Sequence, residues 1–172
     1  MFLHLSYSKG FSVIEILIAI FVIVVALGSI LNVAVVSLKS SFNARTALEA
    51  SSYAQEALEA VRNFRDGVAW NVDDPANEYD GLGVLAKGVA YRTALSLGNP
   101  PRWRLLQGQE TLGVFTRSIV FEQGQRDNQN NIVASGGSAD LDMVKVTVTV
   151  SWLEQGTTRQ SQLITYFTNW GP

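Results

Sequence analysis

The chain has no cysteine and only one histidine among its 172 residues. Without cysteine, disulfides, iron–sulfur clusters and thiol nucleophiles are all excluded. The histidine, His4, precedes every segment expected to fold, which excludes a Ser-His-Asp triad and a histidine-rich metal site from the folded part. Many exported domains manage without disulfides, so the redox compartment stays open.

Charge is also scarce. Charged residues make up 16% of the chain, and 13 basic against 15 acidic residues give a formal net charge of −2. This balance lacks the basic excess of dedicated nucleic-acid binders, so we expect no nucleic-acid partner. The sequence also lacks paired carboxylates, a nucleophile motif and a phosphate-binding glycine loop; Gly81-Leu82-Gly83 has neither the preceding strand nor the following helix of such a loop. We therefore expect neither an enzyme nor a cofactor.

What the chain does have is a long apolar run near its start. Glu15 is the only charged residue between Lys9 and Lys39. Roughly 20 apolar helical residues cross a hydrocarbon core of about 30 Å, so the run is long enough to span a membrane. A secretory signal peptide has an apolar core of only about 7–15 residues, which disfavours cleavage after this longer run. Lys9 places the first ten residues in the cytoplasm by the positive-inside rule. The sequence predicts a single-pass inner-membrane protein with its globular part outside.

Glu15 requires an explanation, because a carboxylate in lipid costs several kcal/mol unless it has a partner. The residues around it read Lys9-Gly10-Phe11-Ser12-Val13-Ile14-Glu15. This string, followed by an apolar helix, resembles the prepilin motif of type IV pilins and type II secretion pseudopilins. The motif positions are Gly10, Phe11 and Glu15, with hydrophobic residues at Val13, Ile14, Ile16, Leu17 and Ile18.

The resemblance implies both processing and assembly. In that family a membrane prepilin peptidase cuts after the glycine on the cytoplasmic side and methylates the new N-terminus. The cut is then expected between Gly10 and Phe11, with N-methylation of Phe11. Glu15 is expected to pair with the N-terminal amine of a neighbouring subunit, and a carboxylate in low dielectric gains most from such a cation. The implied partners are the peptidase, other pilin or pseudopilin subunits and inner-membrane lipid before assembly.

The helical pattern continues past Leu38 without a breaker until Asp66-Gly67, which predicts one helix from about Phe11 to Arg65, roughly 80 Å long. Gly28 and Asn32 are either tolerated within it or allow the helix to stretch on assembly. An apolar stripe at spacings of three and four predicts a face that packs on a sheet: Ala47, Ala50, Ala54, Ala57, Leu58, Val61 and Phe64.

The remaining residues predict strands. Residues 144–152 alternate valine with polar residues, and Glu154-Gln155-Gly156-Thr157 predicts a turn into a paired strand at 159–169. A third strand is expected at 114–123, with weaker candidates at 89–97 and 103–106. We therefore predict an α+β, pilin-like fold in which an antiparallel sheet of about four strands is covered by the long helix.

The predicted organisation has four parts. These are a removed leader at 1–10, an apolar membrane and polymerisation helix at 11–38, an amphipathic helix at 39–66, and a pilin-like globular domain at 67–172.

Three loop features have competing interpretations. The acidic connection 68–88 is either solvated or a surface that touches partners. The stretch 122–142 is expected to be a long loop, and Asp127, Asn128 and Asn130 suggest calcium, although an EF-hand's glycine and terminal glutamate are missing. The cluster Arg102-Trp103-Arg104 suits either single-stranded nucleic acid or a charged edge strand. In all three cases we favour the interpretation without a ligand or partner: a solvated loop for 68–88 and for 122–142, and a charged edge strand for Arg102-Trp103-Arg104.

The resulting expectation is a structural subunit of a type IV pilus or related filament, finally extracellular or periplasmic. Ser151-Trp152 and residues 165–170 resemble minor pilins grouped as pilus modification proteins. A pseudopilin of a type II secretion or DNA-uptake machine shares every feature of residues 9–38. An uncleaved single-pass protein that displays a binding domain is the alternative from another class.

Overall fold

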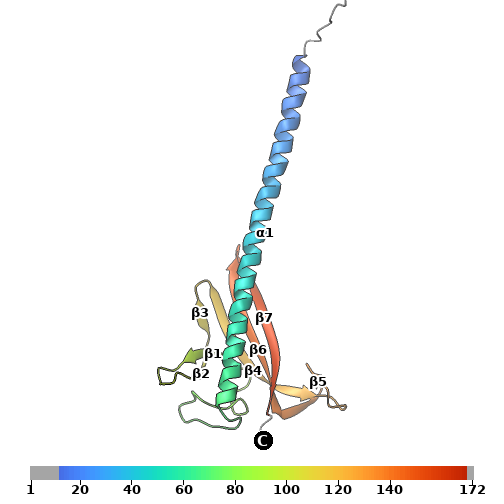
Figure 1. The fold of residues 1–172 in the computed structure, drawn as a ribbon. Coiled ribbons are helices and arrows are strands. Elements are labelled where there is room, and N and C mark those ends of the chain that lie inside the picture. The colour runs from blue at the N-terminus through green and yellow to red at the C-terminus, as the bar shows by residue number, and fades with distance from the viewer. Residues whose placement is uncertain (1–11, 170–172) are drawn as a thin grey trace, which may run out of the picture. The chain divides into compact units, whose positions relative to one another are not determined.

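The computed structural model describes residues 12–169 and contains one helix and seven strands. The chain forms two compact units, residues 1–45 and residues 46–172. The elements, in chain order, are α1 (Val13–Gly67), β1 (Ala90–Leu95), β2 (Trp103–Gln107), β3 (Glu110–Leu112), β4 (Phe115–Arg126), β5 (Ile132–Val133), β6 (Ser138–Glu154) and β7 (Thr157–Thr168). The fold is α+β, with a long N-terminal helix that packs on an antiparallel sheet (Figure 1).

Helix α1 is continuous and confirms the prediction of a single long helix. Its first turn begins after Ser12, whose carbonyl accepts a hydrogen bond from the Glu15 backbone N–H at 3.0 Å. Gly67 is its last residue, and the side chain of Arg102 donates to the Gly67 carbonyl at 3.0 Å. That bond satisfies one of the carbonyls that a helix end leaves free. The helix passes through Gly28 without interruption.

The sheet has the strand order β2-β1-β4-β6-β7, while β3 and β5 each pair with β4 off this path. All pairings are antiparallel. The hairpin between β6 and β7 has the predicted turn, in which Gln155 and Gly156 have φ of 50° and 79°. Positive φ at both central residues gives the turn twist that suits two antiparallel strands.

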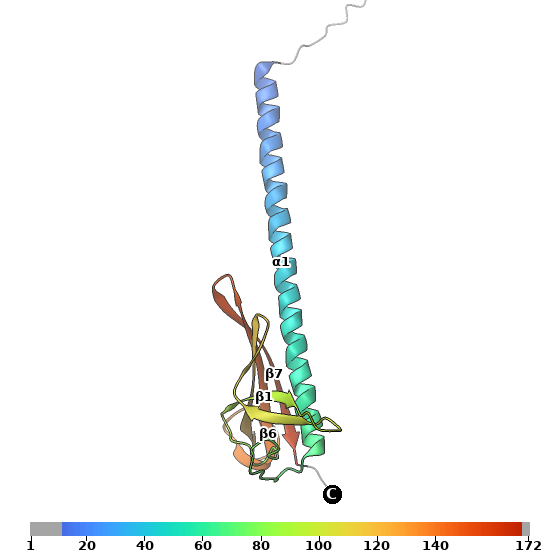
Figure 2. The same cartoon turned by 90° about the vertical axis from the view of Figure 1, so that its left-hand side faces the viewer.

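The later turns of α1 cover one face of the sheet (Figure 2). Ala50, Ala54 and Ala57 are fully buried, and their small side chains let the helix backbone lie close to the strands. Val61 and Phe64 continue the buried stripe. From β6, the alternating valines Val144, Val146, Val148 and Val150 complete this core. The predicted stripe is therefore confirmed from Ala50 onward.

One detail of that stripe was wrong, because Ala47 is exposed. Leu58 is partly buried and packs against the core, as predicted. Ala60, which the spacing rule left out, is 3% exposed. Buried contact begins about one helical turn later than the sequence pattern suggested, because periodicity defines a face of the helix and not where a sheet begins to cover it.

The prediction of about four strands was too low. Strands β3 and β5 contain three and two residues, too few to show an alternating pattern. The expected long loop at 122–142 was also wrong in large part, because β4 runs to Arg126 and β6 begins at Ser138. A register shift between Gln123 and Gly124 interrupts the alternation there and conceals the strand in the sequence. The connection 68–88, by contrast, contains turns and no helix or strand, as predicted.

Candidate functional site

The main candidate site is the apolar surface of α1 between Val13 and Leu38. Its large apolar side chains are at least half exposed all around the helix, from 50% at Ile16 to 75% at Val13. Helices that are apolar on every side normally lie in lipid or among other helices. Within residues 12–169, α1 is the one helix long and apolar enough to cross a membrane. This surface is compatible with a single-pass membrane anchor.

Glu15 lies in the first turn of this helix and is exposed. An acidic residue there interacts favourably with the positive end of the helix dipole. It is the only ionisable residue of α1 before Lys39. The predicted cleavage and methylation positions, Gly10 and Phe11, lie outside the described residues. Pairing of Glu15 with an N-terminal amine therefore stays a prediction.

Arg117 is a buried charge that the sequence interpretation missed. It lies on β4 and is 3% exposed. Its Nε donates to Glu110 at 2.7 Å, its Nη1 donates to the Tyr53 carbonyl at 2.7 Å, and its guanidinium pairs with Glu56 at 3.3 Å. A buried cation is tolerated only with partners of this kind. The detectable signal was a charge at an inward position between Phe115 and Ile119.

Three aromatic rings extend the same contact between helix and sheet. Tyr53 of α1 meets Phe115 of β4 edge to face, with ring centroids 5.4 Å apart. Phe115 in turn meets Trp152 of β6 at 5.9 Å. Edge-to-face pairs add about 0.5–1.5 kcal/mol beyond the area that they bury. Together with Arg117, the rings fix the position of the helix turn at residues 53–56 on the sheet.

The polar residues of the 122–142 stretch bind one another. Arg126 donates to Asp140 at 2.7 Å, and this hydrogen bond holds the pKa of the Asp140 carboxyl below its ordinary value. Asp127 accepts hydrogen bonds from the backbone N–H groups of Gln129 and Asn131, and the Asn131 side chain contributes most to lowering its pKa. Residues 12–169 contain no group of three or more His, Asp or Glu that could hold a metal ion. Of the three residues that suggested calcium, Asp127 caps the turn through its carboxylate.

The Arg102-Trp103-Arg104 cluster lies at the end of the sheet. Arg104 forms an ion pair with Glu78 at 2.7 Å, and Trp103 packs partly against the core. Because β2 is a terminal strand of the sheet, the edge-strand interpretation is confirmed.

The acidic connection 68–88 is largely self-bonded. Asp74 accepts hydrogen bonds from the backbone N–H groups of Glu78 and Tyr79, and Asp80, 8% exposed, accepts one from Asp74 at 2.7 Å. Lys87 donates to the Leu82 carbonyl at 2.6 Å, and burial lowers the pKa of its amine. Two of the acidic residues proposed for partner contact, Asp74 and Asp80, thus stabilise the loop itself.

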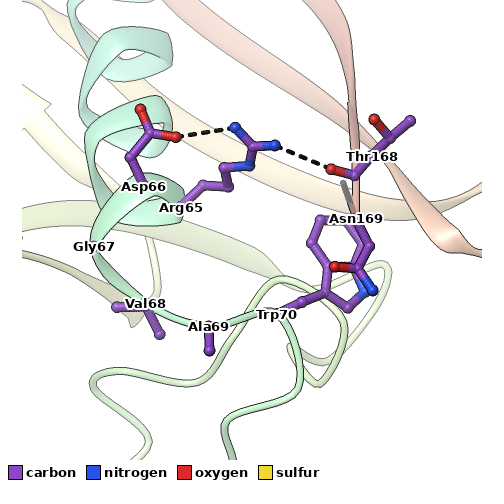
Figure 3. Close-up of a pocket in the computed structure, with 8 residues that line it drawn as sticks. All are labelled: Arg65, Asp66, Gly67, Val68, Ala69, Trp70, Thr168 and Asn169. Atoms are coloured by element: carbon purple, nitrogen blue, oxygen red, sulfur yellow. Dashed lines mark hydrogen bonds and ion pairs between the residues drawn. The ribbon is translucent and has the colours of Figure 1, made fainter. Parts of the chain in front are cut away.

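A cavity of about 540 Å³ lies at the C-terminal end of α1 (Figure 3). Arg65 lies between Asp66 and β7, donating to the Asp66 carboxylate at 3.0 Å and to the Thr168 carbonyl at 3.2 Å. Trp70 and Asn169 contribute to the lining. The Arg65 guanidinium and the Asp66 carboxylate in this cavity therefore bind each other.

No protein-family model, curated protein or solved structure matches the chain. The resemblance to pilins consequently depends on residues 9–18 and is compatible with the α+β fold described above.

Proposed function

We propose that the chain is a pilin-like structural subunit, of the minor type, in a type IV pilus or a related filament. One observation carries the proposal: α1 exposes apolar side chains on all sides from Val13 to Leu38, and its later turns form the core of a globular domain. Such a surface requires lipid before assembly and neighbouring helices afterwards. Head-to-tail packing of equivalent helices produces an open helical assembly.

Processing would precede assembly. The prepilin peptidase would cut between Gly10 and Phe11 and methylate Phe11, leaving a mature chain that begins two residues before α1. Glu15 would then pair with the N-terminal amine of a neighbouring subunit inside the filament. In low dielectric this pair is stronger than in water, and the uncleaved precursor lacks the cation. Cleavage is thereby coupled to assembly through one charge pair.

The proposed location follows from the same features. Lys9 keeps the leader in the cytoplasm and the globular domain crosses to the outside. The subunit then leaves the inner membrane for an extracellular or periplasmic filament. A pseudopilin of a type II secretion or DNA-uptake machine would use the same residues, so the two systems differ in the filament that contains the subunit.

Fractionation of cells tests the proposal. Wild-type chain is expected in isolated filaments, together with other pilin or pseudopilin subunits. The Gly10→Val variant, which should block cleavage, is expected only in the membrane fraction. Ser29→Val, within the same apolar helix, is the matched control and should reach filaments. Finding the wild-type chain exclusively in membranes under conditions in which filaments form would contradict the proposal.

A further inference from the structure

The outer edge of β7 carries unpaired main-chain groups. β7 is the last strand of the sheet and pairs only with β6. The Asn169 N–H donates to the Asp142 carbonyl at 2.7 Å, and in an antiparallel ladder every second residue then faces the same neighbour. The main-chain groups that point away from β6 therefore belong to Thr158, Gln160, Gln162, Ile164 and Tyr166.

The Thr168 carbonyl supports this assignment. Thr168 is one of the alternate residues of β7 whose main-chain groups point away from β6. Its carbonyl accepts a hydrogen bond from Arg65 at 3.2 Å instead of pairing with β6. Among the described residues, no backbone hydrogen bond outside the regular elements involves the other outward-facing residues of β7. A row of main-chain donors and acceptors is thus available along the strand.

β7 also lacks the features that normally protect a sheet edge. Edge strands are usually short or carry prolines, bulges or several charges. β7 has 12 residues without a proline, and Arg159 is its only charge. Its register with β6 runs unbroken from Met143↔Thr168 to Glu154↔Thr157. A strand with these properties can accept another strand along its free side.

The opposite edge of the sheet is different. β2 has only five residues, and its Arg104 forms an ion pair with Glu78 of the preceding connection. The backbone N–H of Leu105 donates to the Glu78 carbonyl at 3.3 Å, which occupies part of the free edge. The chain therefore protects one edge of its sheet and leaves the other available.

The side chains of β7 define the chemistry of a suitable partner. Gln162 donates to Thr149 of β6 at 3.1 Å, and the β7 residues on the same face, Thr158, Gln160, Ile164 and Tyr166, carry no full charge. Ile164 is 54% exposed and offers an apolar contact to a neighbouring strand. Arg159 is exposed near the hairpin turn. An added strand would be uncharged along most of its length, with an acidic residue opposite Arg159.

We propose that the outer edge of β7 binds an extended segment of another polypeptide, which adds to the sheet as an antiparallel strand with an acidic residue opposite Arg159. A second copy of this edge fits poorly, because residues 157–168 contain no acidic residue to face Arg159. Main-chain hydrogen bonds provide the affinity in such complexes and the alternate side chains provide the specificity. The inference does not depend on the proposed filament role.

A fluorescent peptide tests the proposal on the full chain in detergent micelles. The probe has the sequence of Val144–Trp152, the strand that already pairs antiparallel with β7, with the substitution Trp152→Glu. In the same register its glutamate lies opposite Arg159. Fluorescence anisotropy is expected to rise to saturation, and N-methylation of alternate peptide amides should weaken binding at least tenfold, because it removes the donors of the ladder.

Charge variants test the specificity without relying on the peptide backbone. Arg159→Glu should weaken binding of the glutamate peptide about tenfold and favour a peptide with lysine at that position. The matched control Arg92→Glu, on β1, should leave binding unchanged. Equal binding of the N-methylated peptide, or no binding at about 1 mM peptide, would overturn the proposal.

A cysteine variant distinguishes the competing occupant. The chain has no cysteine, so Gln162→Cys provides a single thiol on the outer edge of β7. Under oxidising conditions the variant is expected to remain monomeric. Efficient formation of a disulfide between two copies, with loss of peptide binding, would identify a second copy as the occupant and overturn the assignment to another polypeptide.

Discussion

Arg117 on β4 donates a hydrogen bond of 2.7 Å to the backbone carbonyl of Tyr53, which lies 64 positions earlier in α1. The bond joins the sheet to the helix at the level of the aromatic contacts. Arg117 is almost completely buried, so its charge must be neutralised locally, and Glu110 at 2.7 Å is its closest acidic partner. The position of the helix on the sheet thus depends on a polar contact as well as on apolar packing.

Replacing this arginine should be costly. Arg117→Met leaves Glu110 and the Tyr53 carbonyl without their donor, and breaking a buried pair in this way costs about 3–5 kcal/mol. The free energy of unfolding, measured in urea by tryptophan fluorescence, should fall by that order. Glu56→Gln is the matched comparison, because the Glu56 side chain is 57% exposed and its pair should contribute less than about 1 kcal/mol. Equal losses in the two variants would contradict this account.

The alanine face of α1 should tolerate no added volume. Ala54 is fully buried against the core, and Ala54→Leu should destabilise the fold by about 1–3 kcal/mol through overpacking. Ala47→Leu makes the same chemical change on an exposed part of the helix and should change stability by less than about 0.5 kcal/mol. Urea unfolding of both variants measures the difference. Similar stabilities would show that the close approach of helix and sheet is not limited by these alanines.

The Arg126–Asp140 pair predicts a dependence on pH. Its hydrogen bond lowers the pKa of Asp140 below the ordinary value of 3.8, so its stabilising effect is fully present above that value. It is lost as the pH falls through the lower pKa of the folded state. Asp140→Asn should therefore destabilise the protein at neutral pH, and its difference from wild type should shrink progressively below pH 3.8. A difference that stays constant down to the acid limit of folding would contradict the assignment.

Glu15 should matter for assembly and not for cleavage. Glu15→Val leaves Gly10 and Phe11 in place, so we expect normal processing but much lower incorporation into filaments. Incorporation is measured as the ratio of filament-bound to membrane-bound chain. Ser29→Val is again the matched control, because it removes a polar group that bonds only to the Val25 carbonyl of the same helix. Unchanged incorporation of Glu15→Val would remove the assembly role of the carboxylate.

The sequence predicted those parts of the fold that have a local, periodic signal. The long helix, the valine strand of β6 and the turn at Gln155-Gly156 follow directly from residue spacing and turn chemistry. Strands β3 and β5 were missed because two or three residues carry no period. The strand residues beyond Gln123 were missed because the register shift breaks the alternation.

Some residues of the candidate site could likewise be found from the sequence, and others could not. Glu15 and the apolar surface of α1 were identified from sequence, because a charge inside an apolar run is visible without a structure. Arg117 was missed, since Glu110 becomes its neighbour only when β3 pairs with β4, and Tyr53 only when the helix docks on the sheet. The free edge of β7 was equally hidden, because the order of strands in a sheet is not encoded in any one segment.

The central claim is that a cut between Gly10 and Phe11 prepares the apolar helix for assembly. Intact-mass measurement of the chain extracted from membranes, followed by fragmentation of its N-terminal peptide, tests the claim most directly. We predict a chain that begins at Phe11 and carries one added methyl group on its terminal amine. A chain that retains residues 1–10 would contradict the account and favour an uncleaved membrane-anchored protein.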